Sequence, residues 1–219
     1  MASNLTTFFE TSKEVRGGKF VWWKDGNGEN RRGVLLGSTI ANPTKGFGHL
    51  YAAQLFEYKM GKEGLIFRSF EVKSGTGTSI VLNGDGYSDM PEVGMLLMVA
   101  PDAAATKGQS SKVTAVDYDA AKKEITVTLD TSLTTETGDI LVEAKGSAAS
   151  PTATVLVANP NTFIEADEDL LPTEGYGMTN VSHQISTVWD KMAFISRMQP
   201  LPKYVLAKNR SYIDGVFWI

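Results

Sequence analysis

Short segments of alternating polar and apolar residues recur between residues 64 and 145, separated by turns. Polar and apolar residues alternate without interruption in residues 124–130 (EITVTLD), which predicts a half-buried strand. Residues 112–118 (KVTAVDY) also predict a strand, because β-branched and aromatic side chains favour extended backbone. The link between these segments is short enough for a hairpin, so we expect them to pair directly.

Further strands are indicated on both sides of this hairpin. Residues 79–82 (SIVL) run into residues 83–86 (NGDG), which turn the chain because they tolerate positive φ. Residues 95–99 (MLLMV) are apolar throughout, which is typical of a strand covered on both faces. Residues 138–143 (GDILVE) supply a last strand. These turn signals predict a mainly β (α+β) protein built on a small antiparallel β barrel or sandwich module.

The region before this module, residues 1–63, is expected to hold a polar arm and a hairpin. The hairpin strands would be residues 19–23 (KFVWW) and 32–36 (RGVLL), joined by a Gly- and Asn-rich loop. Adjacent Trp22 and Trp23 lie on opposite faces of such a strand, so one faces away from the local core. We favour the interpretation that a second layer of the same protein covers this outward-facing tryptophan. A partner surface is the alternative, because tryptophan is enriched at binding hot spots.

The region after the module, residues 146–219, is predicted to contain a strand, an amphipathic helix and a terminal strand. Residues 154–157 (TVLV) predict the first strand. Apolar residues between Ser182 and Met198 recur at helical spacing and form one stripe, with Ser182 as the N-cap. Between residues 50 and 58 the apolar spacing fits a strand and a helix equally well.

Large apolar side chains at the two ends of the chain are the candidate interface residues. The chain ends in the sequence VFWI, which is unusual for a free terminus, so we expect it to be fixed inside the subunit or against a neighbour. We further expect the first residues, up to about residue 20, and the last few to become ordered only against neighbouring subunits. The candidates are Trp22, Trp23, Phe217, Trp218 and Ile219.

Composition narrows the classes of function. Hydrophobic residues make up 42% and charged residues 21% of the chain, as in folded globular proteins, and no apolar run approaches the roughly 20 residues that span a bilayer. A net charge of −4 argues against a nucleic-acid partner, because phosphate binding requires clustered Lys and Arg. Without cysteine the chain has no disulfide and no thiolate chemistry. No secretory signal is visible, so we expect synthesis in a cytoplasm.

No catalytic arrangement is predicted. His49 and His183 are the only histidines that could serve as bases, and neither accompanies a nucleophile elbow or a zinc-protease motif. Asp167 and Asp169 could act as paired carboxylates in a carbohydrate-active enzyme, but that reaction needs separated groups facing each other across a cleft. Three acids in a row more often form a solvated loop or meet a basic partner. We therefore predict no catalytic residue and no cofactor.

Two acidic turns are compatible with calcium ligands, residues 25–30 (DGNGEN) and residues 83–86 (NGDG). Alternating oxygen ligands suit calcium, but an EF-hand also requires a carboxylate at its twelfth position, where these loops have Leu36 and Gly94. Both segments are interpreted as ordinary turns, and no metal site is predicted.

The β module resembles small β modules of capsid and head-associated proteins of tailed bacteriophages. The resemblance is carried by residues 93–99, 112–118, 124–129 and 138–141. Residues 158–167 (ANPNTFIEAD) also resemble sequence seen in phage head proteins. Together these segments lie between residues 64 and 172, a region that makes up about half of the chain. The chain is similar in particular to auxiliary capsid proteins, including those of crAss-like gut phages.

This resemblance implies a virion structural protein of the phage head, made in the cytoplasm of the bacterial host. The implied partners are the major capsid protein, other phage head proteins and further copies of the chain itself, with no nucleic acid and no membrane. No catalytic residue comes with such a family. Three alternatives stay open. One is a head-fibre base or carbohydrate-binding attachment module, in which aromatic residues stack on sugars, and another is the carbohydrate-active enzyme. The third is a major capsid subunit, which is less favoured because the chain is short and shows only one strong helical stripe.

Overall fold

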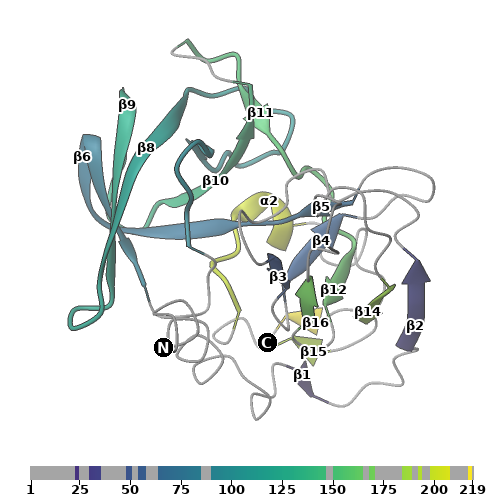
Figure 1. Cartoon of the computed structure of the whole chain (residues 1–219). Helices are drawn as coiled ribbons and strands as arrows, with labels where there is room; N and C mark the ends of the chain where they lie inside the picture. Colours follow the sequence, from purple (N-terminus) through teal and green to yellow (C-terminus); the bar gives the residue numbers. More distant parts are fainter. Residues whose placement is uncertain are drawn as a thin grey trace, which may run out of the picture.

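A computed structural model describes residues 54–57, 64–84, 90–146, 150–161 and 198–207 with their side chains. It also describes the backbone of strands at residues 23–24, 30–35, 48–50, 162–164, 168–170, 184–188, 192–193 and 217–218. Within these residues the protein is mainly β with one short helix, which confirms the predicted fold class (Figure 1).

The elements form four sheets in the described part of the chain, of six, five, three and two strands. The six-stranded sheet contains β6 (Ser69–Asn83), β7 (Leu96–Val99), β8 (Ser110–Asp119), β9 (Glu124–Leu133), β10 (Ile140–Lys145) and β11 (Thr154–Val155). The five-stranded sheet contains β2 (Asn30–Leu35), β4 (Leu55–Glu57), β5 (Leu65–Ile66), β12 (Thr162–Ile164) and β14 (Gln184–Val188). The smaller sheets contain β1 (Trp23–Lys24), β15 (Met192–Ala193) and β16 (Phe217–Trp218), and β3 (Gly48–Leu50) and β13 (Glu168–Leu170). The helix is α2 (Lys203–Leu206).

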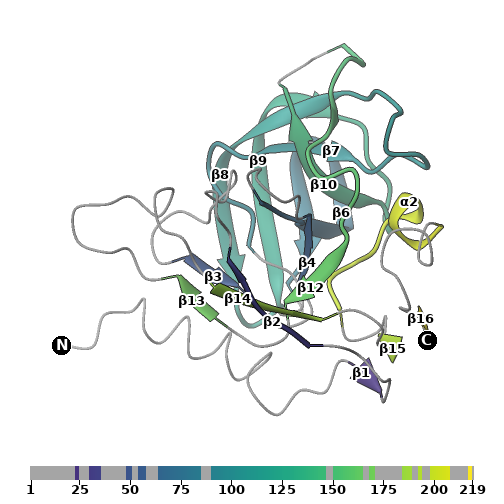
Figure 2. The same cartoon turned by 90° about the vertical axis from the view of Figure 1, so that its right-hand side faces the viewer.

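The six-stranded sheet closes into a barrel. Its strand order is β11-β10-β6-β9-β8-β7, and an additional pairing of β10 with β7 joins its ends into a ring that leaves out only β11. Every pairing in the ring is antiparallel, although an odd number of straight strands could not alternate in this way. The ring closes because two strands change partners along their length. Strand β6 pairs first with β10 and then with β9, and strand β8 pairs first with β7 and then with β9. Figure 2 shows the barrel above the smaller sheets.

The bend in β6 lies at two glycines. Residues 69–71 pair with β10 and residues 77–83 pair with β9, so the strand leaves one side of the barrel and enters the other between them. Gly75 and Gly77 have φ angles of 95° and 84°, which side chains with a Cβ rarely adopt. Thr135, which follows β9, fastens this bend because its hydroxyl donates a hydrogen bond to the Gly75 carbonyl at 2.8 Å.

The barrel interior is filled by alternating apolar side chains of its strands. This first core comprises Phe70, Val72, Ile80, Leu82, Met95, Leu97, Val113, Ile125, Val127, Leu129, Leu133 and Leu141. The predicted alternation in residues 124–130 is confirmed, because its three apolar side chains are all buried there. The predicted hairpin is confirmed as well, since Tyr118 of β8 lies opposite Ile125 of β9.

A second core lies outside the barrel, against β7 and β10. It comprises Leu55, Phe67, Met98, Ala104, Val142, Ala144, Val155, Val157, Met198, Leu201, Tyr204 and Val205. Leu97 faces the barrel interior while Met98 faces this second core, and Leu141 and Val142 of β10 divide in the same way. The prediction that the apolar segment 95–99 is covered on both faces is therefore confirmed. The second core draws on residues before, within and after the predicted 64–145 module.

The predicted helix between Ser182 and Met198 is wrong in position. The described residues of this segment form β14 and β15, and the observed helix α2 begins at Lys203. Three of the five residues of β14 are β-branched, which favours a strand, and this strand pairs on both sides, with β2 and β12. Pairing of residues distant in sequence thus overrides a local helical spacing.

The predicted N-terminal hairpin is also wrong for its described strands. Strand β1 pairs with β15 and strand β2 pairs with β14, and the two belong to different sheets. A local Gly- and Asn-rich link indicated a hairpin, whereas both strands take partners more than a hundred residues later in the chain. In the ambiguous segment at residues 50–58, the described strand residues are Leu50, which ends β3, and Leu55–Glu57, which form β4.

The glycine bend in β6 generates a stability prediction. A Cβ at Gly75 would lie 2.7 Å from the Ser79 carbonyl oxygen, whereas a Cβ at Gly138, whose φ is 88°, would meet nothing within 4 Å. Both positions have positive φ, so Gly138→Ala measures the free-energy cost of a side chain at positive φ without a steric contact. We expect Gly75→Ala to lower the free energy of unfolding by about 1–3 kcal/mol more than Gly138→Ala, as overpacking does. Urea unfolding of both variants measures this difference, and equal losses would contradict the proposed crowding.

Candidate interaction surfaces

Three of the five candidate interface residues, from the two ends of the chain, lie in one three-stranded sheet. Its strand order is β1-β15-β16. Trp23 lies opposite Ala193 in the antiparallel pairing, and Trp218 lies opposite the same Ala193 in the parallel pairing. Phe217 lies opposite Met192. The structure thus brings three of the five candidates together at the level of the backbone, while Trp22 and Ile219 lie outside the described residues.

Parallel pairing of β15 with β16 requires a crossover, because a tight turn can join only antiparallel strands. The connecting chain contains α2, and Tyr204 and Val205 of this helix are buried in the second core. Backbone pairing of Phe217 and Trp218 within the subunit matches the expectation that the apolar terminus is fixed inside the subunit. The ordering of the two ends only against neighbours stays a prediction.

Tyr204 is the principal contact of α2. Its ring meets the ring of Phe67 edge to face, with centroids 6.5 Å apart and an interplanar angle of 83°. Its hydroxyl donates a hydrogen bond to the Val157 carbonyl at 3.1 Å. Burial, and secondarily the negative charge of Glu57, raise the pKa of this phenol above its ordinary value of 10.0. Tyr204 is therefore a neutral structural anchor.

A short segment at the start of β6 holds the C-terminal region by polar contacts. The Gln199 side-chain amide donates a hydrogen bond to the Phe67 carbonyl at 3.2 Å, and the Ser69 hydroxyl donates one to the Pro200 carbonyl. Between them, the Arg68 guanidinium contacts the Glu143 carboxylate at 3.1 Å. Glu143 belongs to β10, so this segment ties the barrel wall to the chain that leads into α2.

The ion pair of Arg68 and Glu143 was missed by the sequence interpretation. The side chain of Arg68 is only 2% exposed and that of Glu143 is 15% exposed. Each charge interrupts a mainly apolar segment, LIFRSF and ILVEA, and an isolated charge in a buried segment requires a partner. The opposite charges of Arg68 and Glu143 could therefore have predicted this pair from the sequence. The sequence around Tyr204 gave no comparable indication of its role, because aromatic residues are common in both strands and helices.

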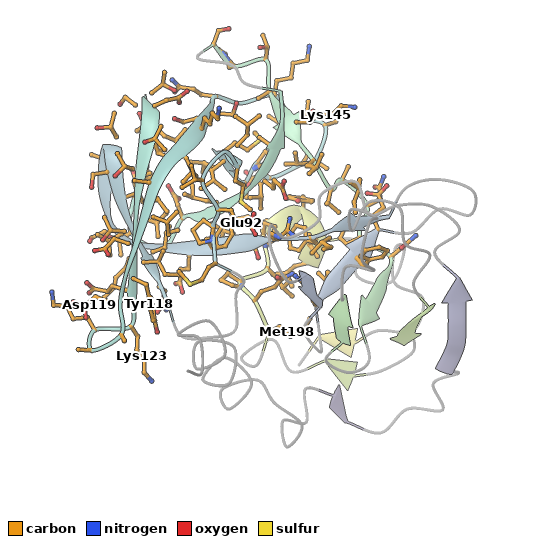
Figure 3. The ribbon with its side chains drawn as sticks, in the orientation of Figure 1. Glu92, Tyr118, Asp119, Lys123, Lys145 and Met198 are labelled. Atoms are coloured by element: carbon orange, nitrogen blue, oxygen red, sulfur yellow. The ribbon has the colours of Figure 1, made fainter. Side chains whose placement is uncertain are left out.

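The turn between β8 and β9 forms a projecting tip of the barrel. Figure 3 shows Tyr118, Asp119 and Lys123 there, far from Lys145 at the opposite end. The Asp119 carboxylate accepts hydrogen bonds from the backbone amides of Ala121 and Lys122 at 3.0 and 3.1 Å. The backbone bond from Lys122, followed by its ammonium group at 3.2 Å, lowers the pKa of Asp119 below its ordinary value of 3.8. The tip is therefore locally ordered, and Tyr118 is 37% exposed on it.

A polar cluster joins β8 to β9 near the irregularity in their pairing. The Asp130 carboxylate accepts a hydrogen bond from the backbone amide of Lys112 and one from the Ser111 hydroxyl, each at 2.9 Å. These two bonds, in that order, lower the pKa of Asp130 below its ordinary value of 3.8. Ser111 is fully buried, so its hydroxyl is held in place.

The predicted chemistry candidates are only partly described. His49 lies on β3 directly opposite Asp169 on β13, whereas His183 and Asp167 lie outside the described residues. Most of the two acidic turns also lies outside, and the described Asn83 donates a hydrogen bond to Glu71 at 3.4 Å. Within the described residues, no three His, Asp or Glu side chains come together as a metal site. The described helix is neither long nor apolar enough to cross a membrane.

Comparison of the chain with protein-family models, with curated proteins and with solved structures gives no match.

The buried ion pair generates a stability prediction. Glu143→Gln removes the carboxylate charge beside the buried Arg68 guanidinium, and we expect it to lower the free energy of unfolding by about 3 kcal/mol. Glu124→Gln is the matched control, because Glu124 contacts Lys73, whose side chain is 49% exposed, at 2.8 Å. An exposed pair of this kind contributes at most about 1 kcal/mol. Chemical denaturation compares the two variants, and similar losses would show that burial of Arg68 is unimportant.

The polar cluster at Asp130 generates a pH prediction. Because its folded pKa is depressed, Asp130 stabilises the fold above its unfolded pKa, and this contribution is lost as pH falls through the folded pKa. Ser111→Ala removes one hydrogen bond, so we expect the pKa of Asp130 to rise. Carboxyl NMR titration measures it, with Asp119 as an internal control whose pKa should not change. The explanation is incorrect if Ser111→Ala leaves the pKa of Asp130 unchanged.

Proposed function

We propose that this protein is a virion structural protein, an auxiliary capsid protein that binds the major capsid lattice and decorates or stabilises the head of a tailed bacteriophage. One observation carries the proposal on the structural side: tryptophan-bearing segments from both ends of the chain flank the same residue, Ala193, in one short sheet. The resemblance of the β module to head-associated proteins supplies the class of partner. Other phage head proteins and further copies of the chain are secondary partners.

The described barrel surface suits an exposed component of a particle. Large apolar residues on it are few: among the described residues, Val93 before β7 and Tyr118 at the hairpin tip are exposed. Single exposed apolar residues of this kind are ordinary on soluble surfaces and do not form a docking patch. We therefore assign the shell contact to the β1-β15-β16 sheet and leave the barrel facing solvent. Repeated weak contacts of many copies with a lattice would then add up through avidity.

A rigid carrier is useful for such a contact, because ordering an interface on binding reduces affinity. The barrel closes on itself, and its wall supports the core that holds α2. That helix lies within the connection from β15 to β16, and β16 pairs with β15 within the subunit, so we expect the terminal strand to be in place before a partner binds. In this view the barrel and the second core preorganise the short sheet.

Binding to capsids tests the proposal directly. Purified protein is added to heads that lack it, and bound copies are counted by quantitative mass spectrometry after sedimentation. We expect saturable binding at a fixed number of copies per head, and the same number in virions. A glycan array run in parallel tests the attachment-module alternative. Binding to glycans without binding to heads, or absence of the protein from virions, would overturn the proposal.

Tryptophan variants locate the contact. We expect Trp23→Ala and Trp218→Ala each to weaken capsid binding by about 30-fold, because truncation of an aromatic hot spot costs about 2 kcal/mol or more. Tyr118→Ala is the matched control on the barrel tip, and its affinity should stay within about threefold of the original. Unfolding midpoints of the variants confirm that the barrel is intact. Equal losses for Tyr118→Ala and the tryptophan variants would place the contact elsewhere.

A further inference from the structure

Strand β6 ends in an asparagine followed by a glycine, and the fold holds both residues. Asn83, the last residue of β6, lies opposite Glu124 of β9. The backbone amide of Gly84 donates a hydrogen bond to the Lys123 carbonyl at 2.9 Å. The Asn83 side-chain amide donates one to the Glu71 carboxylate at 3.4 Å. The backbone amide and the side-chain amide of this Asn-Gly dipeptide are therefore both engaged.

An Asn-Gly dipeptide can react with itself, because glycine has no Cβ to keep its nitrogen away from the preceding side chain. The Gly84 nitrogen loses its proton to hydroxide and forms a bond to Cγ of Asn83. The bond from Cγ to Nδ2 breaks, and ammonia leaves with a proton taken from water. Water then opens the resulting succinimide at either carbonyl, which leaves aspartate or isoaspartate at position 83. The reaction consumes water and requires no other reactant.

We propose that Asn83 is a deamidation site that the end of β6 keeps closed and that reacts when this end opens. In a strand the backbone amides point along the sheet toward neighbouring strands, whereas side chains stand roughly perpendicular to it. Ring closure therefore requires the Asn83 backbone to rotate out of the strand conformation. This rotation breaks the hydrogen bond of Gly84 to Lys123 and the pairing with Glu124. Figure 3 shows Lys123 on the projecting tip, where strand ends open more easily than the core.

Packing explains why a glycine follows Asn83. A Cβ at position 84 would lie 3.0 Å from the Lys123 carbonyl oxygen and 3.1 Å from Cε2 of Tyr118. Both distances are tighter than an ordinary van der Waals contact, so a larger residue would force the tip to shift away from β6. Gly84 thus fits against the tip for the same reason that it makes Asn83 reactive.

The product would weaken the pairing that protected the asparagine. A carboxylate at position 83 adds a negative charge beside Glu71 and opposite Glu124, and like charges directly opposite each other destabilise a sheet. Lys73 already contacts Glu124 at 2.8 Å, so a further carboxylate would compete for the same ammonium group. Isoaspartate also lengthens the backbone by a methylene group, which disturbs the hydrogen bonds between β6 and β9. We therefore expect a modified chain to open more easily at this end.

Deamidation of the full-length protein tests the proposal. It is followed by peptide mass spectrometry at one mildly alkaline pH, in native buffer and in guanidinium chloride. We expect Asn83 to react at least about fivefold more slowly in the native protein, because two hydrogen bonds must break before the ring closes. In guanidinium chloride the second Asn-Gly dipeptide, Asn27–Gly28, is the internal reference and should react at a similar rate. Equal rates for Asn83 in the two buffers would overturn protection by the fold, and reaction of Asn27 without Asn83 in the unfolded chain would overturn the site.

A variant that loosens the tip tests whether opening controls the reaction. The Asp119 carboxylate accepts hydrogen bonds from the backbone amides of Ala121 and Lys122, so Asp119→Ala weakens the order of the tip. We expect Asn83 to deamidate about 2- to 10-fold faster in folded Asp119→Ala than in the unmodified protein, the equivalent of about one lost hydrogen bond. Asp117→Ala is the matched control, because Asp117 is an exposed carboxylate on the same strand, and the rate at Asn83 should stay unchanged. An unchanged rate in Asp119→Ala, or an equal increase in both variants, would contradict control by opening of the tip.

Discussion

Strands β7 and β10 are buried on both faces, and each of the two cores of the protein uses one face of them. Leu97 and Leu141 close the barrel interior, while their neighbours Met98 and Val142 belong to the second core. The pairing of β10 with β7 is also the contact that turns the six-stranded sheet into a ring. This shared wall is the constraint on which the rest of the structure depends, because loss of either core would expose one face of it.

The wall connects the barrel to the candidate interface through a chain of contacts. Arg68 contacts Glu143 of β10. On either side of it, the Phe67 carbonyl accepts a hydrogen bond from Gln199, and the Ser69 hydroxyl donates one to the Pro200 carbonyl, in the segment that leads into α2. The helix in turn lies in the connection between β15 and β16, two strands that pair in parallel. A charged pair buried at the wall is costly to break, which makes this connection stiff. The proposed capsid contact thus inherits its geometry from the barrel.

The barrel was largely predictable from the sequence, and the sheets around it were not. Strict alternation in residues 124–130 and the apolar run 95–99 each imply a specific pattern of burial, and the structure has both. The segment around Ile185 was misread as a helix because its apolar residues recur at helical spacing, and pairing with distant strands overrides that local pattern. The meeting of Trp23 and Trp218 at Ala193 has no local signature either. The opposition of His49 and Asp169 likewise depends on register, which short strands without a strong pattern leave unspecified.

Native-state hydrogen exchange at increasing denaturant tests most directly whether the shared wall makes both cores one cooperative unit. The informative amides are those of Ala100 in the wall, Val113 in the barrel and Phe67 in the second core, bonded to the carbonyls of Ile140, Met95 and Leu55. We expect all three amides to exchange with the same opening free energy, that of global unfolding. If Phe67 exchanges through a much lower opening free energy while Ala100 and Val113 stay protected, the second core opens independently of the wall and the account is contradicted.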